Sequence, residues 1–323
     1  MSDPASGMQA AAEVPEFERR FSGAVGGPDD VGKPRSLWTD AWDDLKHSKI
    51  FWIGLVLVTL VVVMALVPAL FMIFSPNKDP RFCDLAFSRQ PPSSSAWFGY
   101  DTQGCDVYAR TIYGARPSIM VGVLTTIFAV SVGGAMGIVG GYYGGWRDSV
   151  TSRVTEIFFA IPLLLGGVLV LTSFPSGATT EIASVMKVVL ALGILAWTSI
   201  TRIMRSSVIQ VKNADFVQAA KALGAPGGRV IRSHILPNSL APVIVVAVIS
   251  LGGYIAAEAT LSFLGIGLQP PAISWGIAIS DAARYVRVAP HMLFFPAVFL
   301  SITVLAFIML GDAVRDALDP KLR

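Results

Sequence analysis

The sequence predicts an all-α membrane protein with six transmembrane helices, and three observations lead to that fold class. Only 15% of the 323 residues are charged and 53% are hydrophobic, whereas an ordinary soluble domain carries about 25% charged residues. The apolar residues form runs of the roughly 20 residues that a helix needs to cross the hydrocarbon core. The charged side chains lie almost entirely between these runs.

Each run is expected to be a helix, because lipid offers the backbone no hydrogen-bond partner and the segment must satisfy its own polar groups. Charge is almost absent from the runs, apart from Lys187 near the start of the fourth, and Arg202 and Glu258 at the ends of the fourth and fifth. The predicted spans cover about residues 50–74, 117–141, 157–174, 182–203, 235–258 and 292–311. They leave extracytoplasmic loops at 75–116 and 259–291 and a cytoplasmic loop at 204–234.

A further uncharged stretch, residues 260–280, is predicted to be a broken extracytoplasmic or re-entrant segment. Gln269, Pro270 and Pro271 interrupt it, and consecutive prolines cannot continue a lipid-exposed helix. Pro68 and Pro162, inside the first and third runs, are interpreted first as kinks and only second as gates.

The distribution of Lys and Arg predicts which side of the membrane each loop faces. With the N-terminus in the cytoplasm, nearly twice as many of these residues lie on the cytoplasmic side as on the other, as the positive-inside rule requires. The even number of spans then returns the C-terminus to the cytoplasm. Residues 37–323 are therefore expected to form one transmembrane domain.

Residues 1–36 are expected to form a disordered cytoplasmic tail, since they are rich in Pro, Gly, Ser and acids and lack apolar periodicity. Gly27 to Lys33 has the spacing of a phosphate-binding loop, but Pro34 stands where Ser or Thr is needed to hold magnesium. The tail also lacks the apolar core and cleavage site of a secretory signal peptide. We therefore expect no ATPase site in the chain and a retained first span.

The sequence offers no catalytic or metal-binding constellation. His47, His234 and His291 lie far apart near predicted membrane edges, and no serine within a span has a histidine at a comparable depth. The net charge of +3 is too small and too scattered to predict a nucleic-acid partner. We expect neither an enzyme nor a bound metal or cofactor.

Two ionisable residues, Lys187 and Glu258, come close to the membrane interior, and both fall toward the outer ends of their spans. A charge deep in the bilayer is costly enough to indicate an ion or proton path. The position of these residues gives ion-coupled transport little support. Two interpretations of Glu258 stay open, a residue lining a polar translocation pathway and an interfacial carboxylate without a transport role.

The two cysteines, Cys83 and Cys105, both fall in the first predicted extracytoplasmic loop, where an oxidising environment permits a disulfide. Closing a loop of this length would remove roughly 3 kcal/mol of chain entropy in the simplest model. We expect a Cys83–Cys105 disulfide that restrains the loop; the alternative is two unrelated free thiols.

Gly133, Gly137, Gly141 and Gly145 recur at intervals of four along and just beyond the second span. Small residues at this spacing let another helix approach closely, so that dispersion provides the attraction. We expect packing within the chain, with a subunit interface as the alternative.

Residues 214–237, in the cytoplasmic loop, predict a short helix from Ala214, capped by Asn213 and closed by Gly224 in a left-handed conformation. Its small apolar side is expected to hold four residues at helical spacing: Phe216, Ala219, Ala220 and Leu223. A second short helix over residues 229–235 would lead through Leu236 and Pro237 into the fifth span. Such a segment could lie on anionic lipid, but adjacent alanines favour insertion into a protein groove.

The stretch QAAKALG followed by RSHILPN resembles the cytoplasmic coupling motif of bacterial ABC importer permeases. Ala219, Ala220, Gly224, Leu236 and Pro237 match that motif, while Gln218 replaces its glutamate and His234 its isoleucine. Four further stretches resemble the C-type membrane subunit of dipeptide and oligopeptide importers: FGYDTQGCDVYARTIYGARPS, GYYGGWRDSVTSRVTEIFFAIP, AEATLSFLGIGLQPPAISWG and LGDAVRDALDPKLR. The resemblance covers residues 38–323, with Cys105 where that family commonly has Arg.

The resemblance implies a permease subunit in the bacterial cytoplasmic membrane that pairs with a B-type permease and binds two cytoplasmic ATPases, which hold ATP and Mg. An extracytoplasmic binding protein would deliver peptide. The ATPases would be contacted through the helix residues named above, including Gln218 without its family charge, and through Leu236 and Pro237. The runner-up is an ion-coupled secondary transporter of small solutes. Peptide length stays undetermined, and nickel, haem or glycopeptide cargo is not excluded.

Overall fold

The computed structural model describes residues 37–173 and 180–318. Within these ranges the chain is helical and forms no extended β-strand. The predicted tail, with its phosphate-loop-like stretch, lies outside the described residues.

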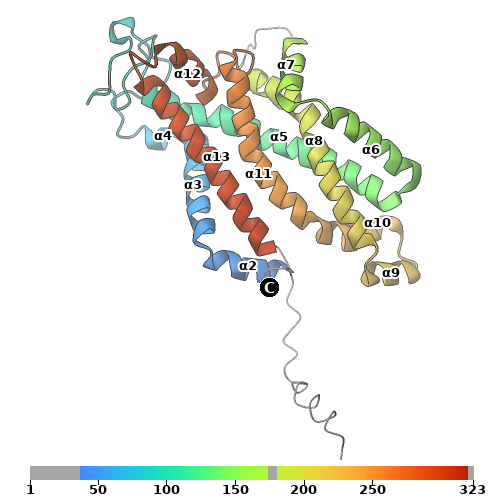
Figure 1. The fold of residues 1–323 in the computed structure, drawn as a ribbon. Helices are drawn as coiled ribbons and strands as arrows, with labels where there is room; N and C mark the ends of the chain where they lie inside the picture. The colour runs from blue at the N-terminus through green and yellow to red at the C-terminus, as the bar shows by residue number, and fades with distance from the viewer. Residues whose placement is uncertain (1–36, 174–179, 319–323) are drawn as a thin grey trace, which may run out of the picture.

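Twelve α-helices build the described chain, and the longest of them run between its two ends (Figure 1). Five are long and apolar enough to cross a membrane, and there are six such spans when the bent pair α6–α7 is counted as one. The prediction of an all-α membrane protein is therefore confirmed, and its six spans correspond to the five long helices and the bent pair. The helices are α2 (Leu37–His47), α3 (Lys49–Leu66), α4 (Pro68–Phe71), α5 (Val107–Tyr143), α6 (Gly145–Phe159), α7 (Leu163–Ser173), α8 (Glu181–Lys212), α9 (Asp215–Ala222), α10 (Gly227–Val230), α11 (Leu236–Phe263), α12 (Trp275–Ala282) and α13 (His291–Leu318).

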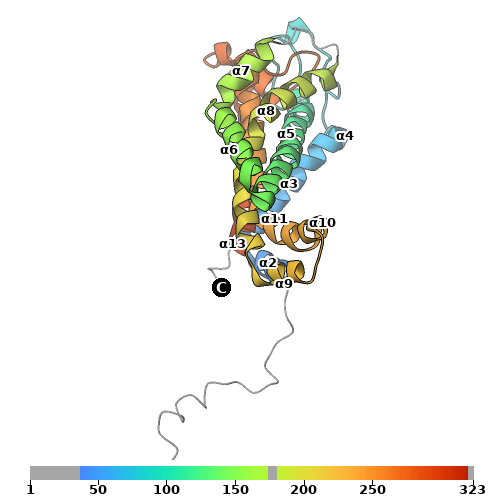
Figure 2. The same ribbon diagram turned by 90° about the vertical axis from the view of Figure 1, so that its right-hand side faces the viewer.

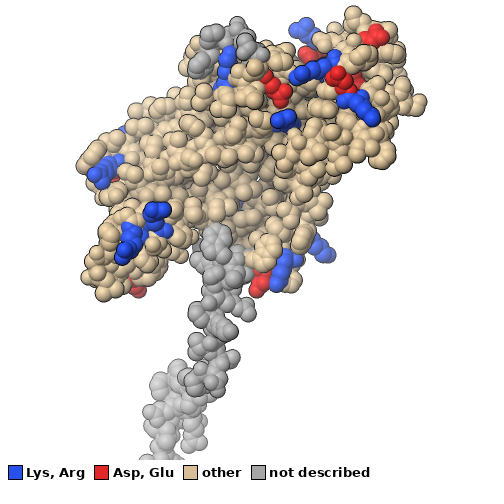
Figure 3. All heavy atoms as spheres, turned by 180° about the vertical axis from the view of Figure 1, so that it is seen from behind, with Lys and Arg blue, Asp and Glu red and all other residues tan. Residues whose placement is uncertain are grey.

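The molecule has two polar ends separated by an apolar band. Charged side chains gather toward opposite ends of the visible surface in Figure 3, with an almost uncharged region between them. Figures 1 and 2 place α2, α9 and the C-terminal end of α13 at one end, and α12 with the loop before α5 at the other. We call these the α9 end and the α12 end.

The second span begins ten residues earlier than predicted, at Val107 rather than residue 117. The carboxyl group of Asp106 caps the helix by accepting a hydrogen bond from the Ala109 amide. Pro117 lies inside the helix. The predicted span began at Pro117 because the uncharged run begins after Arg116. A helix packed on several sides tolerates the hydrogen bond that this proline cannot donate.

Pro68 and Pro162 both mark breaks. The first predicted span stops at Leu66, and Pro68 opens the separate short helix α4. The third is really two helices, α6 and α7, bent by 83° at residues 160–162, and it begins at Gly145 rather than at residue 157. Gly144 and Gly145 have positive φ, so the turn after α5 is tight and α6 follows at once.

The fourth and fifth spans are longer than predicted. Helix α8 continues to Lys212, so the first nine residues assigned to the cytoplasmic loop are helical. The fifth span runs from Gly227 through a π-helical turn at Ile231–Ile235 to Phe263. Pro237 has no N–H to donate to the preceding turn, and the wider π-turn precedes that point. The sixth, α13, likewise extends beyond both ends of the predicted range, to His291 and Leu318.

The glycine repeat of α5 packs within the chain. A Cβ atom added at Gly137 would meet the Thr201 carbonyl oxygen and the Met204 side chain of α8. Cβ atoms at Gly133 and Gly141 would meet α8 one turn away on either side. Intramolecular packing was the preferred interpretation, and it is confirmed for these three glycines; Gly145 has open space around it.

Candidate coupling and outer sites

Helix α9 is a short exposed helix fixed to the body by one buried side chain. Val217 is fully buried and packs in one cluster with Met204 and Val208 of α8 and with Val230 and Ile235 of the turn leading into α11. The helix ends at Ala222, and Gly224 follows with φ of +80°. A left-handed residue after the last turn favours glycine, as the sequence predicted.

The predicted cap of α9 is wrong. Asn213 forms the C-terminal cap of α8, and Ala214 precedes α9 without a side-chain hydrogen bond. Gln218 supplies part of the missing connection, because its side-chain amide donates to the Lys212 carbonyl oxygen at 2.8 Å. A carboxylate at this position could not donate that bond.

The apolar side predicted for α9 faces outward. Phe216 is 48% exposed and Leu223 is 89% exposed. Ala219 is also exposed, and Ala220 is partly covered. Two large apolar side chains on a protruding helix at the charged end of the molecule form a surface suited to a protein groove. We call Phe216, Ala219, Ala220 and Leu223 the knob surface.

The opposite side of α9 contacts the end of α5. The Lys221 ammonium lies 5.6 Å from the centre of the Tyr142 ring. The Lys212 ammonium, at the end of α8, donates to the Gly141 carbonyl oxygen at 2.9 Å. A cation–π contact of this kind leaves no periodic signature in the sequence.

A second link joins the same region to α6. The Arg205 guanidinium of α8 makes two hydrogen bonds to the Asp148 carboxyl group of α6, one of them 2.8 Å long. This two-pronged geometry fixes orientation more firmly than a single contact does. Polar contacts at the α9 end therefore join α5, α6 and α8 to one another.

Leu236 and Pro237 do not belong to the knob surface. They lie at the first residues of α11, after the π-turn, with Leu236 partly buried and Pro237 exposed. His234 lies between the two parts, with its ring 6.3 Å from that of Phe216. The motif residues thus lie at two neighbouring places, helix α9 with its C-terminal turn and the start of α11.

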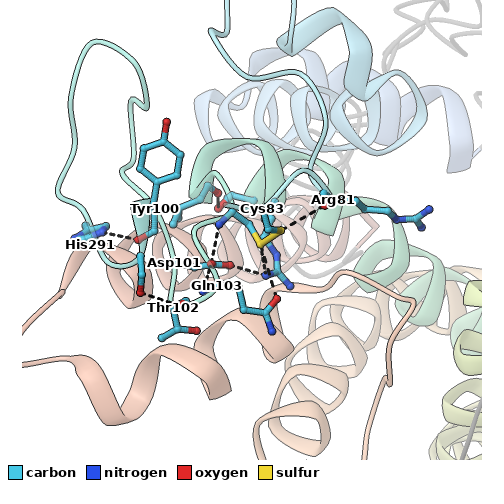
Figure 4. Close-up of polar contacts among 12 residues, drawn as sticks. Arg81, Cys83, Tyr100, Asp101, Thr102, Gln103 and His291 are labelled. Atoms are coloured by element: carbon cyan, nitrogen blue, oxygen red, sulfur yellow. Dashed lines mark hydrogen bonds and ion pairs between the residues drawn. A yellow bond between two sulfur atoms is a disulfide. The ribbon is translucent and has the colours of Figure 1, made fainter. Parts of the chain in front are cut away.

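At the α12 end, Cys83 and Cys105 form the expected disulfide. Asp101 organises the same loop: one carboxyl oxygen accepts from the Gln103 and Cys105 amides, and the other pairs with Arg110 of α5 at 2.5 Å. Figure 4 shows Asp101 and Gln103 beside Cys83 of the disulfide. His291 of α13 contacts the Tyr100 carbonyl oxygen at 3.2 Å.

An open cavity of about 510 Å³ lies beside the disulfide. Arg81, Arg110 and Asp281 line it together with the turn around Pro270 and Pro271. Removal of water by the surrounding protein raises the pKa of Asp281, and the charge of Asp101 adds to this, while Arg110 opposes it. The predicted break at the two prolines is confirmed, since α11 stops at Phe263 and α12 begins at Trp275.

Glu258 is completely buried in α11. One carboxyl oxygen accepts a 2.7 Å hydrogen bond from Ser262. The hydroxyl groups of Ser118 and Ser274 also lie against the carboxyl group, but Ser118 and the second carboxyl oxygen make no well-aligned bond. The carboxyl group reaches no surface of the described chain, so this geometry does not support a lining role. No group of three or more potential metal ligands occurs among the described residues.

The comparisons place this architecture in a family. Residues 133–323 match the family "Binding-protein-dependent transport system inner membrane component", and residues 36–92 match the "N-terminal TM domain of oligopeptide transport permease C". The chain is 39% identical to the dipeptide transport system permease protein DppC of Bacillus subtilis, over 91% of this chain and 89% of that protein.

Other relatives agree. The oligopeptide transport system permease protein OppC of Bacillus subtilis is 36% identical over 90% of this chain and 92% of its own length. The glutathione transport system permease protein GsiD of Pectobacterium atrosepticum is 31% identical over 90% of this chain and 93% of its own.

A fold comparison leads to the same class. The structure is similar to the inward-facing MetNI methionine ABC transporter, with a TM-score of 0.52 at 18% identity, over 64% of this chain and 96% of that one. A likeness at this identity carries the fold alone. Together with the sequence matches, it shows that the chain belongs to the binding-protein-dependent transport system inner membrane components and is a multi-pass inner-membrane permease of the ABC transporter type.

Proposed function

We propose that this chain forms half of the transmembrane pathway of an ATP-driven peptide importer. Dipeptide, oligopeptide and glutathione permeases are its relatives by name, and all three cargoes are peptides. A second, B-type permease supplies the other half of the pathway. An extracytoplasmic binding protein delivers the peptide, and two cytoplasmic ATPases supply the energy.

The knob surface carries this proposal. Phe216 and Leu223 are too exposed to serve folding, yet Val217 holds their helix firmly to the body. Burying large apolar side chains in a partner's groove lowers the free energy of the complex. A groove on an ATPase is the occupant that fits a transport permease, and nucleotide-driven movement of the ATPase then displaces α9 as a rigid body.

The α9 end faces the cytoplasm in this proposal, and both chain termini lie on that side. The chain itself binds no cofactor and no nucleic acid and catalyses nothing; ATP and Mg belong to the ATPase subunits. The excess of Lys and Arg in the loops at the α9 end supports this orientation.

Co-purification combined with transport tests the proposal. A tagged chain, expressed with its genomic neighbours, is expected to bring down two nucleotide-binding proteins and a second permease. The reconstituted assembly should take up peptide only with ATP and the binding protein. Uptake by this chain alone, driven by an ion gradient, would favour the secondary transporter and refute the proposal.

A further inference from the structure

The long fifth span connects the two polar ends without interruption. From Gly227 to Phe263 it forms 37 continuous helical residues, roughly 55 Å at 1.5 Å per residue. Its first turns pack with Val217 of α9 in one buried cluster. A displacement of α9 is therefore transmitted to one end of a continuous rod.

The other end of the rod is closely joined to what we call the outer segment, residues 264–282, comprising the turn after α11 and helix α12. A Cβ atom at Gly276 of α12 would lie 2.7 Å from Ala259 and from Ser262. A Cβ atom at Gly267 would lie closer still, 2.4 Å from the Ser262 backbone nitrogen. Such close approach leaves no room for the outer segment to slide along α11.

A relay of hydrogen bonds fixes the same junction. The Ser262 hydroxyl donates to Glu258 and at the same time accepts from the Leu268 amide at 3.0 Å. Because the Ser262 hydroxyl hydrogen points to Glu258, the lone pairs of the Ser262 oxygen are available to the Leu268 backbone amide. Both Glu258 and Ser262 are buried, so loss of either partner would strand a polar group away from water.

From this geometry we propose that Glu258 is a positioning residue, which locks the outer segment to α11 so that the segment moves with the rod. The rod's movement rests on the function proposed above; the lock itself does not. Glu258 acts through Ser262 and contacts no cargo. Ser274, which caps α12 by accepting from the Ile277 amide, lies against the same carboxyl group and brings the start of α12 under its control.

The outer segment is also tied to two other spans. The Trp275 indole donates to the Thr111 carbonyl oxygen of α5 at 2.8 Å. The backbone N–H of Gln269 donates to the Ser184 hydroxyl of α8, also at 2.8 Å. Movement of α11 relative to α5 and α8 would therefore strain these two hydrogen bonds. With the Glu258–Ser262–Leu268 hydrogen bonds in place, the outer segment moves with α11; without them, it stays with α5 and α8.

Three substitutions separate the relay from other roles of Glu258. Glu258→Gln keeps an oxygen that accepts from Ser262 but carries no charge. Glu258→Leu fills a similar volume and accepts nothing. Ser262→Ala removes the relay from its other side and leaves Glu258 in place, which covers the possibility that a substitution at Glu258 prevents folding.

The measurement is amide hydrogen exchange of residues 264–282 in the purified four-subunit complex, with and without ATP. We expect roughly tenfold faster exchange in Glu258→Leu and Ser262→Ala than in the unmodified protein, because a buried hydrogen bond is lost. Glu258→Gln should exchange at nearly the unmodified rate. The unmodified segment should also change its exchange on ATP binding, and Ser262→Ala should lose that response.

Uptake measured on the same preparations completes the test. Glu258→Gln should retain more than half of the uptake, whereas Ser262→Ala should lose most of it while the subunits still co-purify. Unchanged exchange in both Glu258→Leu and Ser262→Ala would overturn the lock. Loss of uptake in Glu258→Gln with normal exchange would overturn it too, in favour of a charge-dependent pathway role. If the unmodified complex took up no peptide, the proposed function would fail, while the exchange comparison without ATP would still test the lock.

Discussion

The Gln218 side-chain amide donates a 2.8 Å hydrogen bond to the carbonyl oxygen of Lys212, the last residue of α8. The related importer motif has a carboxylate at this position. An amide serves here because the end of a helix presents unpaired carbonyl oxygens that need donors. The substitution thus exchanges a charge for a tether between α9 and α8.

Gln218→Glu should loosen α9. The carboxylate cannot donate to Lys212 and would lie against the negative end of the α8 dipole. Since the bond is exposed, the loss should be no more than about 1 kcal/mol, seen as faster amide exchange in residues 213–223. Gln218→Asn, which shortens the donor, should behave similarly. Exchange rates equal to those of the unmodified protein in both variants would show that this hydrogen bond does not stabilise α9.

Gly137→Ala should disrupt packing between α5 and α8, because the added methyl group would meet the Thr201 carbonyl oxygen at 2.8 Å and the Met204 side chain at 2.7 Å. Overpacking of this kind costs about 1–3 kcal/mol. Gly134→Ala is the matched control, since its nearest neighbour would be 3.8 Å away. Thermal unfolding of the purified complex should show a lower Tm for the first variant only. An equal Tm in both would contradict the packing assigned to Gly137.

The Cys83→Ser, Cys105→Ser double variant should free the loop before α5 while leaving the spans intact. The simplest chain-entropy model gives the disulfide roughly 3 kcal/mol of stabilisation. Limited proteolysis should cut residues 75–106 faster in the double variant, and reductant should make the unmodified protein equally sensitive. If reductant increases cleavage in the double variant as much as in the unmodified protein, the effect does not come from this disulfide.

Asp281→Asn should stabilise the complex at neutral pH. The pKa of Asp281 is raised, chiefly by burial, so the stability that its protonated form contributes is complete below its ordinary pKa of about 3.9 and is lost as the pH rises through the raised value. The variant should therefore have a higher Tm than the unmodified protein at pH 7 and nearly the same Tm at the lowest pH the complex tolerates. A lower Tm at pH 7 would mean that attraction between Asp281 and Arg110 outweighs burial.

The sequence was sufficient for the number and type of spans, because uncharged runs of this length have few alternatives in lipid. The start of α5 was not predicted, because the capping role of Asp106 depends on the hydrogen bond from the Ala109 amide, which the sequence alone does not show. Nor did it give the length of α8, whose last turns lie outside the apolar band and are held by packing that periodicity does not reveal.

The knob surface shows the same limit on a smaller scale. The spacing of Phe216 and Leu223 predicted one apolar side, but not that this side would face outward. Val217 has only alanines one turn away, Ala214 and Ala220, so no large apolar residue shares its face, although it is more completely buried than Phe216 or Leu223. Glu258 was singled out for its charge, while its partner Ser262, one turn later, carries no signal that distinguishes it from other serines in the spans.

Docking through the knob surface is the central claim, and Ala220→Arg tests it most directly. The matched control is the same change at Ala222, which is exposed and lies about 160° from Ala220 around the axis of α9. Both variants should insert into the membrane and pair with the second permease. Ala220→Arg should lose ATPase binding and peptide uptake, whereas Ala222→Arg should keep most of both; normal uptake by Ala220→Arg would contradict the docking assigned to this surface.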